Sequence, residues 1–480
     1  MKASWLAAVA IIGTSCATKS PPEAKVQLPV DAPATWQAAE TITNAPSSRW
    51  WESFNNTNLT ALVEEAWQNN RNLRVAVSRL EASSVEARLA GADRMPKVDL
   101  GFDANRRQQN FIGLPIPGGG GAVLKSRSTS FGLNLSASWE VDLWGRVRAG
   151  QSAATADFEA TSADVAGAEL SLAAQTVKAW LGAAEAKQQL DLAGQTATSY
   201  RTTAEQVRTR YEQGLRSPLD LRQALASAAS AEAQREERKV QFERAVRRLE
   251  VLLGRYPSGK LEADYRLPSL PGAVPAGVPA EIISRRPDMA AAERRIAAAG
   301  ERVKQSKAAL YPRISLTASG GTSTRDLEDL LTRNFSVWSI AANAVQPLFE
   351  GGKLRANVEL NKVREHTAQL EFVDTALNAF GEVENALVGE KLWNKREARL
   401  KEAKEQSAAA LRLAEERYFQ GLETFTTVLD SQRRLFEAES QLLALRRQRL
   451  DNRVDLHVAL GGGFEHVVEV KAKAETAKTN

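Results

Sequence analysis

The stretch from Ser128 to Leu143 constrains the fold of this chain most, because apolar side chains fill every second position of it. A period of two places alternate side chains on opposite faces of a β-strand. Strands of soluble proteins average about 5–6 residues, whereas a transmembrane strand needs roughly 9–11 residues, with lipid on one face and water on the other. Taken alone, the stretch fits either kind of strand. Its apolar positions are Phe131, Leu133, Leu135, Ala137, Trp139, Val141 and Leu143.

Composition narrows the class of protein. A chain of 480 residues is long enough for about three ordinary domains. Charged residues make up 25% of the chain and balance to +5, so no basic surface for nucleic acid is indicated. Alanine is frequent and aromatic residues are few, which favours long helices packed through small side chains. The one cysteine excludes an intrachain disulfide.

The N-terminus resembles a bacterial lipoprotein signal. Residues 1–15 are expected to form a signal peptide, whose apolar run is too short to span a bilayer. Cys16 follows small residues, as in a lipobox, although Gly13 stands where that motif usually has leucine. We expect Cys16 to be the lipidated N-terminus of the mature chain and residues 16–58 to be an extended segment. The alternative is an ordinary signal peptide with an incidental cysteine.

The rest of the chain contains no stretch of about 18 apolar residues, so no transmembrane helix is expected. Such a chain enters a membrane only as a closed β-barrel or through a lipid anchor. Residues 461–480 are the C-terminal tail, in which Val470–Asn480 is rich in lysine and alanine and is expected to be disordered.

Residues 59–253 are expected to form a first structural repeat. A helix over Leu59–Asp93 ends at Met95-Pro96. A strand over Lys97–Arg106, a flexible loop over Arg107–Arg127 and the opening stretch then make a hairpin spanning residues 97–143. A long helical hairpin over residues 147–253 follows. It turns at Gly214, and Ser217 and Pro218 are suited to start its second helix.

After a Pro- and Gly-rich linker over residues 254–285, the same plan recurs in residues 286–460. We expect a helix over Asp288–Leu310, a hairpin of two strands over residues 313–348 and a second long helical hairpin over residues 353–460. The strands are expected at Arg313–Thr322 and Asn334–Leu348, and the alternation of the fourth strand is the weakest.

The repeat is also visible in the residues themselves. Arg210-Tyr211-Glu212-Gln213-Gly214-Leu215 matches Arg417-Tyr418-Phe419-Gln420-Gly421-Leu422 at five of six positions. Each of these sequences precedes a turn between a very long helix and its returning partner.

Four strands cannot close a barrel, and open edges are not tolerated in lipid. The chain must therefore oligomerise, giving eight strands as a dimer or 12 as a trimer, and about eight is the smallest usual barrel. The helices carry coiled-coil seams of small residues and are expected to pack against neighbouring chains. A helix of roughly 65 residues would be about 100 Å long. In the first long helix the seam is Leu170, Ala174, Val177, Leu181 and Ala184.

The duplicated plan, the two turn sequences and Leu429-Asp430-Ser431-Gln432 resemble TolC-like outer membrane factors. With Cys16, they resemble the lipoprotein branch of tripartite efflux systems. The resemblance covers about residues 50–460. It implies a mixed α and β membrane fold, in which a homotrimer forms a 12-stranded transmembrane β-barrel, four strands per chain. The barrel would continue into a coiled-coil α-helical barrel in the periplasm.

The resemblance also implies a passive exit duct for small molecules, lipid-anchored in the outer membrane. Its partners would be a periplasmic adaptor and an inner-membrane pump of the resistance-nodulation-division class, which supplies the energy. No cofactor, metal or catalytic residue is expected. The histidines, His366, His457 and His466, do not fit a metal motif, and there is no P-loop or nucleophile elbow.

The turns between the long helices are the expected periplasmic gate. By the resemblance, Tyr418 corresponds to the family's tip tyrosine and Asp430 to its pore-facing aspartate, so a trimer would carry a ring of three carboxylates that attracts cations. Asp220 could face the lumen or simply favour its helix start. Tyr211 and Tyr418 could be gate or core residues, and Asp430 a solvated one. The expected adaptor-docking residues are Gly214, Leu215, Ser217, Pro218, Leu219, Gly421, Leu422, Glu423 and Phe425.

Two other functions stay open on the sequence alone. A type I protein-secretion channel would share the architecture and serve a different pump. A soluble coiled-coil scaffold would share the helices, but it would not explain the alternating strand, the signal peptide or Cys16.

Overall fold

The computed structural model describes residues 20–24, 36–37, 48–112, 123–272, 274, 279 and 282–462. The expected signal peptide, Cys16 and the tail beyond residue 462 lie outside this part. The chain divides into two compact units. The first comprises Met1–Val26, Glu81–Glu159 and Glu293–Leu370, and holds the strands; the second comprises Gln27–Leu80, Ala160–Ala292 and Glu371–Asn480, and is helical.

The first helical segment is two helices, which corrects the single helix expected over Leu59–Asp93. A short 3-10 helix η1 (Trp50–Phe54) precedes α1 (Thr57–Asn69) and α2 (Arg71–Ala92). Asn70 separates them with an extended ψ of 127°. Its side-chain oxygen accepts hydrogen bonds from the backbone N–H groups of Asn72 (2.9 Å) and Leu73 (3.1 Å). A residue that caps the next helix in this way interrupts the helical pattern without a proline.

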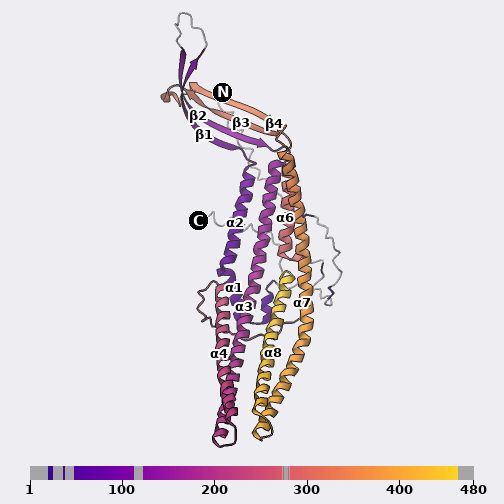
Figure 1. Ribbon diagram of the computed structural model, residues 1–480. Coiled ribbons are helices and arrows are strands. Elements are labelled where there is room, and N and C mark those ends of the chain that lie inside the picture. The colour runs from indigo at the N-terminus through magenta and orange to yellow at the C-terminus, as the bar shows by residue number, and fades with distance from the viewer. Residues whose placement is uncertain are drawn as a thin grey trace. The chain divides into compact units, whose positions relative to one another are not determined.

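Four strands form one antiparallel sheet in the order β1-β2-β3-β4 (Figure 1). They are β1 (Lys97–Phe111), β2 (Leu124–Val141), β3 (Arg313–Thr324) and β4 (Ser336–Val345). β1 was expected to end at Arg106 but continues to Phe111. The reason is that residues 107–111, polar except for Phe111, pair with residues 124–128 of β2, and backbone pairing does not require apolar side chains. β4 is shorter than expected, and the short 3-10 helices η3 (Leu327–Asp329) and η4 (Arg333–Phe335) precede it.

The long helices have matching lengths in the two halves of the chain. α3 (Arg146–Glu212) and α7 (Lys353–Phe419) have 67 residues each. Their returning partners, α4 (Pro218–Leu252) and α8 (Phe425–Ala459), have 35 residues each. The short α5 (Ile282–Arg285) leads into α6 (Pro287–Ala308), the counterpart of α2.

The core of the helical unit contains buried tryptophans together with small buried side chains of the long helices. Trp50, Trp51 and Phe54 of η1 pack with Trp180 of α3, and all are at most 3% exposed. On the seam expected in α3, Ala174, Val177, Leu181 and Ala184 are buried.

Within the described part of the chain, no helix is both long enough and apolar enough to cross a membrane.

Candidate functional site: a one-sided sheet and a clamped helix tip

The sheet of the first unit is apolar on one face across all four strands. Directly paired residues point to the same side, and the register aligns Leu100 of β1 with Leu135 of β2. Leu135 in turn aligns with Gly320 of β3, and Gly320 with Trp338 of β4. We call this side the apolar face. Thr322, Thr324 and Ser336 are its polar members, at one end of β3 and β4. Its other members are Val98, Leu100, Phe102, Ala104, Phe131, Leu133, Leu135, Ala137, Trp139, Val141, Ile314, Leu316, Ala318, Gly320, Trp338, Ile340, Ala342 and Ala344.

The opposite side, the polar face, carries short polar and acidic side chains. One row runs from Asp99 through Ser136 and Ser319 to Ser339, and the last two hydroxyls are 2.8 Å apart. Apolar exceptions are Phe111 at the end of β1 and three residues of β4, whose alternation was expected to be the weakest: Val337, Ala341 and Val345. One face thus suits an apolar environment, and the other suits water.

The apolar face is open to solvent in the single chain. Trp338 is 77% exposed, Ile340 78% and Leu100 71%. Within the described residues, β1 and β4 each pair with one neighbour only, so each leaves one edge of backbone donors and acceptors unpaired. Large exposed apolar surfaces mark contacts with lipid or protein, and a sheet edge needs a partner wherever water is excluded.

In the helical unit, the two repeated sequences build the same turn. The N–H of Leu215 donates to the carbonyl of Arg210 (2.8 Å), and that of Gly214 to Tyr211 (2.9 Å). In the second turn the corresponding bonds run from Leu422 to Arg417 (2.9 Å) and from Gly421 to Tyr418 (3.0 Å). This is the Schellman pattern, which ends a helix at a left-handed glycine.

The glycines are required for their backbone conformation. Gly214 has φ +74° and Gly421 φ +81°, and a Cβ atom would meet no atom within 4 Å at either position. Side chains are therefore disfavoured there by backbone strain and not by crowding.

Next to the first turn, Ser217 caps α4, accepting a hydrogen bond from the N–H of Asp220 (3.2 Å), and Pro218 takes the first helical position.

The two turns are clamped together by arginines of the first. The guanidinium of Arg216 lies over the ring of Tyr418 at 4.0 Å and donates to the Tyr418 carbonyl. Arg210 lies over the ring of Phe419 at 4.6 Å and donates to its carbonyl at 3.0 Å. Both cations thus cap the C-terminus of α7, where the helix dipole favours positive charge. We call these contacts the tip clamp.

Tyr418 is the centre of the tip clamp. It is 1% exposed and packs on Phe425. Its hydroxyl donates to the Asp220 carboxylate at a long 3.5 Å. Burial raises the pKa of the Tyr418 hydroxyl above its ordinary value, and Arg216 only partly opposes this, so the group stays a neutral donor. Tyr211, its counterpart in the repeat, is 39% exposed.

Asp430 is held by two arginines of its own helix. Its carboxylate accepts from Arg433 Nη2 and from Arg434 Nε, both at 2.6 Å. These hydrogen bonds lower the pKa of Asp430, so it is ionised at neutral pH. Neither arginine was among the expected site residues, although their spacing of three and four residues from Asp430 on a helix was a usable signal. No local spacing indicated the contact of Arg216 with Tyr418, because the two residues lie far apart in the sequence.

The expected docking residues are mostly at the surface of the tips. Leu215, Leu219 and Leu422 are each 64% exposed. Glu423 accepts hydrogen bonds from the Thr424 N–H and the Thr427 hydroxyl, both at 3.0 Å, which lower its pKa. Phe425 differs from the others: it is 2% exposed and belongs to the cluster around Tyr418.

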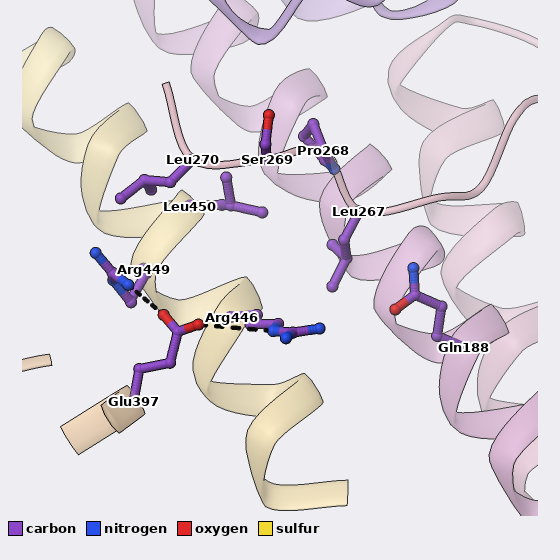
Figure 2. Close-up of a pocket in the computed structure, with 9 residues that line it drawn as sticks. All are labelled: Gln188, Leu267, Pro268, Ser269, Leu270, Glu397, Arg446, Arg449 and Leu450. Carbon is purple, nitrogen blue, oxygen red and sulfur yellow. Dashed lines mark hydrogen bonds and ion pairs between the residues drawn. The ribbon is translucent and has the colours of Figure 1, made fainter. Parts of the chain in front are cut away.

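Away from the tips, a cavity of about 370 Å³ lies between α3, α7, α8 and the linker (Figure 2). Glu397 of α7 points toward Arg446 and Arg449 of α8. It also forms an ion pair with Lys401, whose Nζ lies 2.9 Å from Glu397 Oε1. Burial acts to raise the pKa of Glu397, but the hydrogen bonds from Lys401 and Arg449 outweigh it and lower the pKa. The cavity wall is therefore an ion-pair network that joins α7 and α8.

No group of three or more metal-ligating side chains that could hold an ion occurs among the described residues.

Comparison with known proteins agrees with this geometry. The sequence profile of the family described as "Outer membrane efflux protein" matches residues 62–255 and 278–462. The chain is 31% identical to the pyoverdine export outer membrane protein OpmQ of Pseudomonas putida KT2440, over 94% of this chain and 95% of that protein. It is 33% identical to the outer membrane protein OprJ of Pseudomonas aeruginosa PAO1, over 86% of each.

Among solved structures, the outer-membrane channel OprN superposes with a TM-score of 0.84 at 28% identity, over 93% of this chain and 99% of that one. The sheet and paired helices are those of a channel-forming outer membrane protein. The chain belongs to the outer membrane efflux protein family. It is an outer membrane exit component for efflux, and the protein-secretion alternative is not favoured.

Proposed function

We propose that three copies of this chain form a gated duct that passively conducts small molecules from the periplasm to the exterior. The observation that carries the proposal is the sheet, which is apolar on one face and has two unpaired edges. In lipid those edges must pair with other chains. Copies contribute four strands each, so 8 and 12 are the smallest closed barrels, and the likeness to TolC-like channels favours 12.

In such a trimer the apolar face meets lipid and the polar face lines the duct. At 1.5 Å per residue, helices of the length of α3 and α7 are about 100 Å long and would cross the periplasm as a coiled-coil barrel. The matched helix lengths and the shared hydrogen-bond pattern of the two turns support an internal duplication, with repeats at residues 59–253 and 286–460 joined by the linker 254–285.

The tips of the helical hairpins would form the gate. In the proposal, the tip clamp holds the two hairpins of each chain closed through Arg216, Tyr418 and Asp220. The ring of three Asp430 carboxylates lies at the neck, with Arg433 and Arg434 balancing its charge. Tyr211, which is more exposed than Tyr418, is the second tyrosine of the proposed gate.

The partners follow from the exposed tips. Leu215, Leu219 and Leu422 offer an apolar surface for a periplasmic adaptor, with Gly214, Ser217, Pro218, Gly421 and Glu423 around it. An inner-membrane pump of the resistance-nodulation-division class would supply the energy, and this chain would catalyse no reaction. A relative at 31% identity is named as the outer membrane protein of a toluene efflux pump, which supports a tripartite assembly. Lipidation of Cys16 would add an anchor.

A cysteine scan of β2 tests the proposal. Single cysteines at residues 131–141, in a background where Cys16 is replaced by serine, are labelled with an environment-sensitive fluorophore in liposomes. We expect odd positions to be quenched by lipid-borne quenchers and even positions by water-soluble ones. Native mass spectrometry should give three chains per particle, and planar bilayers should show ion conductance. A monomer, or a scan without a period of two, would contradict the proposal.

A further inference from the structure

The β1–β2 hairpin extends beyond the four-stranded part of the sheet (Figure 1). The last pair between β2 and β3 is Phe131 with Thr324, whereas β1 and β2 remain paired as far as Phe111 and Leu124. On the side of the apolar face, this extension is no longer apolar. The facing pairs there are Arg106 with Thr129, Gln108 with Arg127, and Asn110 with Lys125.

The lysines and arginines of the four strands fall into two groups, which lie on opposite sides of the sheet. Arg106, Lys125 and Arg127 lie on the apolar side, all in the hairpin extension, and we call them the outer cations. The other cations of the described strands, Lys97, Arg107 and Arg313, occupy the alternate positions and so lie on the side of the polar face.

The outer cations have no acidic partner among the described residues. Arg106 and Lys125 make no hydrogen bond or ion pair with that part of the chain, and all three are exposed. Arg127 Nε donates to Gln108 Oε1 at 2.7 Å, which orients the guanidinium and leaves its other N–H groups available. Arg106 and Arg127 are diagonal neighbours across the two strands, where like charges repel unless an anion lies between them.

The height of the apolar row places these cations at a lipid surface. From Phe131 to Val141 the row advances ten residues, which at about 3.4 Å per residue and a tilt of about 45° is about 24 Å high. Apolar bands of outer membrane barrels are about 25 Å tall. By the same arithmetic, Arg106, opposite Thr129, lies about 5 Å above the band and Arg127 about 10 Å above it.

We propose that Arg106, Arg127 and Lys125 bind the phosphate groups of the lipids around the outer end of the barrel, namely the phosphorylated glycolipid of the outer leaflet. The inference rests on the proposed function, which puts the apolar face in lipid and the helices in the periplasm. Arginine binds phosphate through two parallel hydrogen bonds, each strengthened by charge. A bound phosphate also removes the repulsion between Arg106 and Arg127.

A binding titration tests the proposal with the full-length protein in detergent. The probe is fluorescent lipid A, with dephosphorylated lipid A and inorganic phosphate as separate arms. The test variant is Arg106→Gln/Lys125→Gln/Arg127→Gln. The matched control, Lys97→Gln/Arg107→Gln/Arg313→Gln, removes as many cations from the other side of the sheet.

We expect the test variant to bind lipid A at least tenfold more weakly than the wild type and the control variant to bind it as the wild type does. Dephosphorylated lipid A should bind the wild type weakly, and inorganic phosphate should not displace lipid A at equal concentration. Equal binding by the test variant and the wild type would overturn the proposal. So would undiminished binding of the dephosphorylated lipid, or displacement by equimolar phosphate.

Conductance in bilayers of neutral phosphatidylcholine separates this inference from the proposed function. The wild type and the test variant should both conduct there, which also shows that the variant folds. Loss of conductance by the wild type would refute the duct itself. A conducting wild type whose lipid A binding is independent of the outer cations would refute only the lipid site.

Discussion

The guanidinium carbon of Arg216 lies 4.0 Å from the centre of the Tyr418 ring, although the two residues belong to different halves of the chain. The same side chain donates a hydrogen bond to the Tyr418 carbonyl. One residue of the first turn thus holds both the ring and the backbone end of the second helical hairpin. A cation–π contact of this kind contributes about 0.5–2 kcal/mol. The tips of one chain are therefore coupled by a contact that can be removed with a single substitution.

Arg216→Gln should loosen the closed tip. Loss of about 1 kcal/mol per chain changes an opening equilibrium by roughly fivefold for each chain released. Single-channel recordings in planar bilayers should show a higher open probability. Arg417→Gln is the matched control, because Arg417 holds the equivalent place to Arg210 in the repeat but its side chain makes no hydrogen bond or ion pair with the described residues. Equal open probability in the two variants would count against the tip clamp.

Asp430→Ala should make the neck more positive, because it removes a carboxylate from Arg434 and leaves Arg433 paired with Glu437 alone. We expect trimers to persist, block by cations to weaken and the cation-to-anion permeability ratio to fall. Reversal potentials under a salt gradient measure this ratio. Arg433→Gln should shift it in the opposite direction. Unchanged conductance, block and selectivity in Asp430→Ala would remove Asp430 from the gate.

Gly421→Ala should destabilise the second turn by about 1 kcal/mol, since φ is +81° there and a side chain is strained in that region. Gly194→Ala, inside α3, should instead stabilise by about 0.5–1 kcal/mol. Both positions have open space around an added Cβ, so the pair separates backbone strain from crowding. Thermal melting of the two variants in the same detergent gives the comparison, and a melting temperature raised by both would refute the strain argument.

Gly321→Ala should impair the sheet, because an added Cβ would approach the Leu133 carbonyl oxygen to 2.0 Å and force the backbones of β2 and β3 apart. Its neighbour Gly320 lies on the apolar face, and a Cβ there meets nothing within 4 Å. We therefore expect Gly320→Ala to assemble normally. The yield of heat-resistant oligomers on gels reports assembly. Wild-type yields for both variants would mean that the close approach is not required.

His457→Phe should make the free energy of unfolding less sensitive to acid. His457 stacks on Trp50 with ring centres 5.2 Å apart, and burial, with Arg453 nearby, lowers its pKa from 6.5 to about 4. Between these pH values the unfolded chain binds a proton that the folded chain does not, so stability falls as the pH drops from 6.5 to 4. The full effect is about 3 kcal/mol at 1.36 kcal/mol per pKa unit.

Phenylalanine keeps the ring stacking of His457 but cannot titrate. The loss of melting temperature between pH 7 and pH 5 should therefore be smaller in His457→Phe than in the wild type. His366→Phe, at an exposed position of α7, is the control and should behave as the wild type. An equal pH dependence in all three proteins would exclude His457 as a source of it.

The sequence by itself determined the local elements of this protein. A period of two along β2 identified the strand and its two faces, and the repeated Arg-Tyr-x-Gln-Gly-Leu identified both helix turns. These features depend on neighbours within a few residues, so they can be read from consecutive letters. The pairing of Asp430 with Arg433 and Arg434 is likewise local and follows from their spacing on the helix.

The tertiary structure alone decided which of the repeated residues are equivalent. Tyr211 and Tyr418 stand at the same place in sequences that match at five of six positions. Yet the first is exposed and the second is buried under Arg216. Likewise, the side chain of Asn70, where the first helix breaks, donates to the carbonyl of Leu252, 182 residues away. Burial and clamping depend on side chains that come from distant parts of the chain, so the local sequence does not indicate which of two similar turns will receive them.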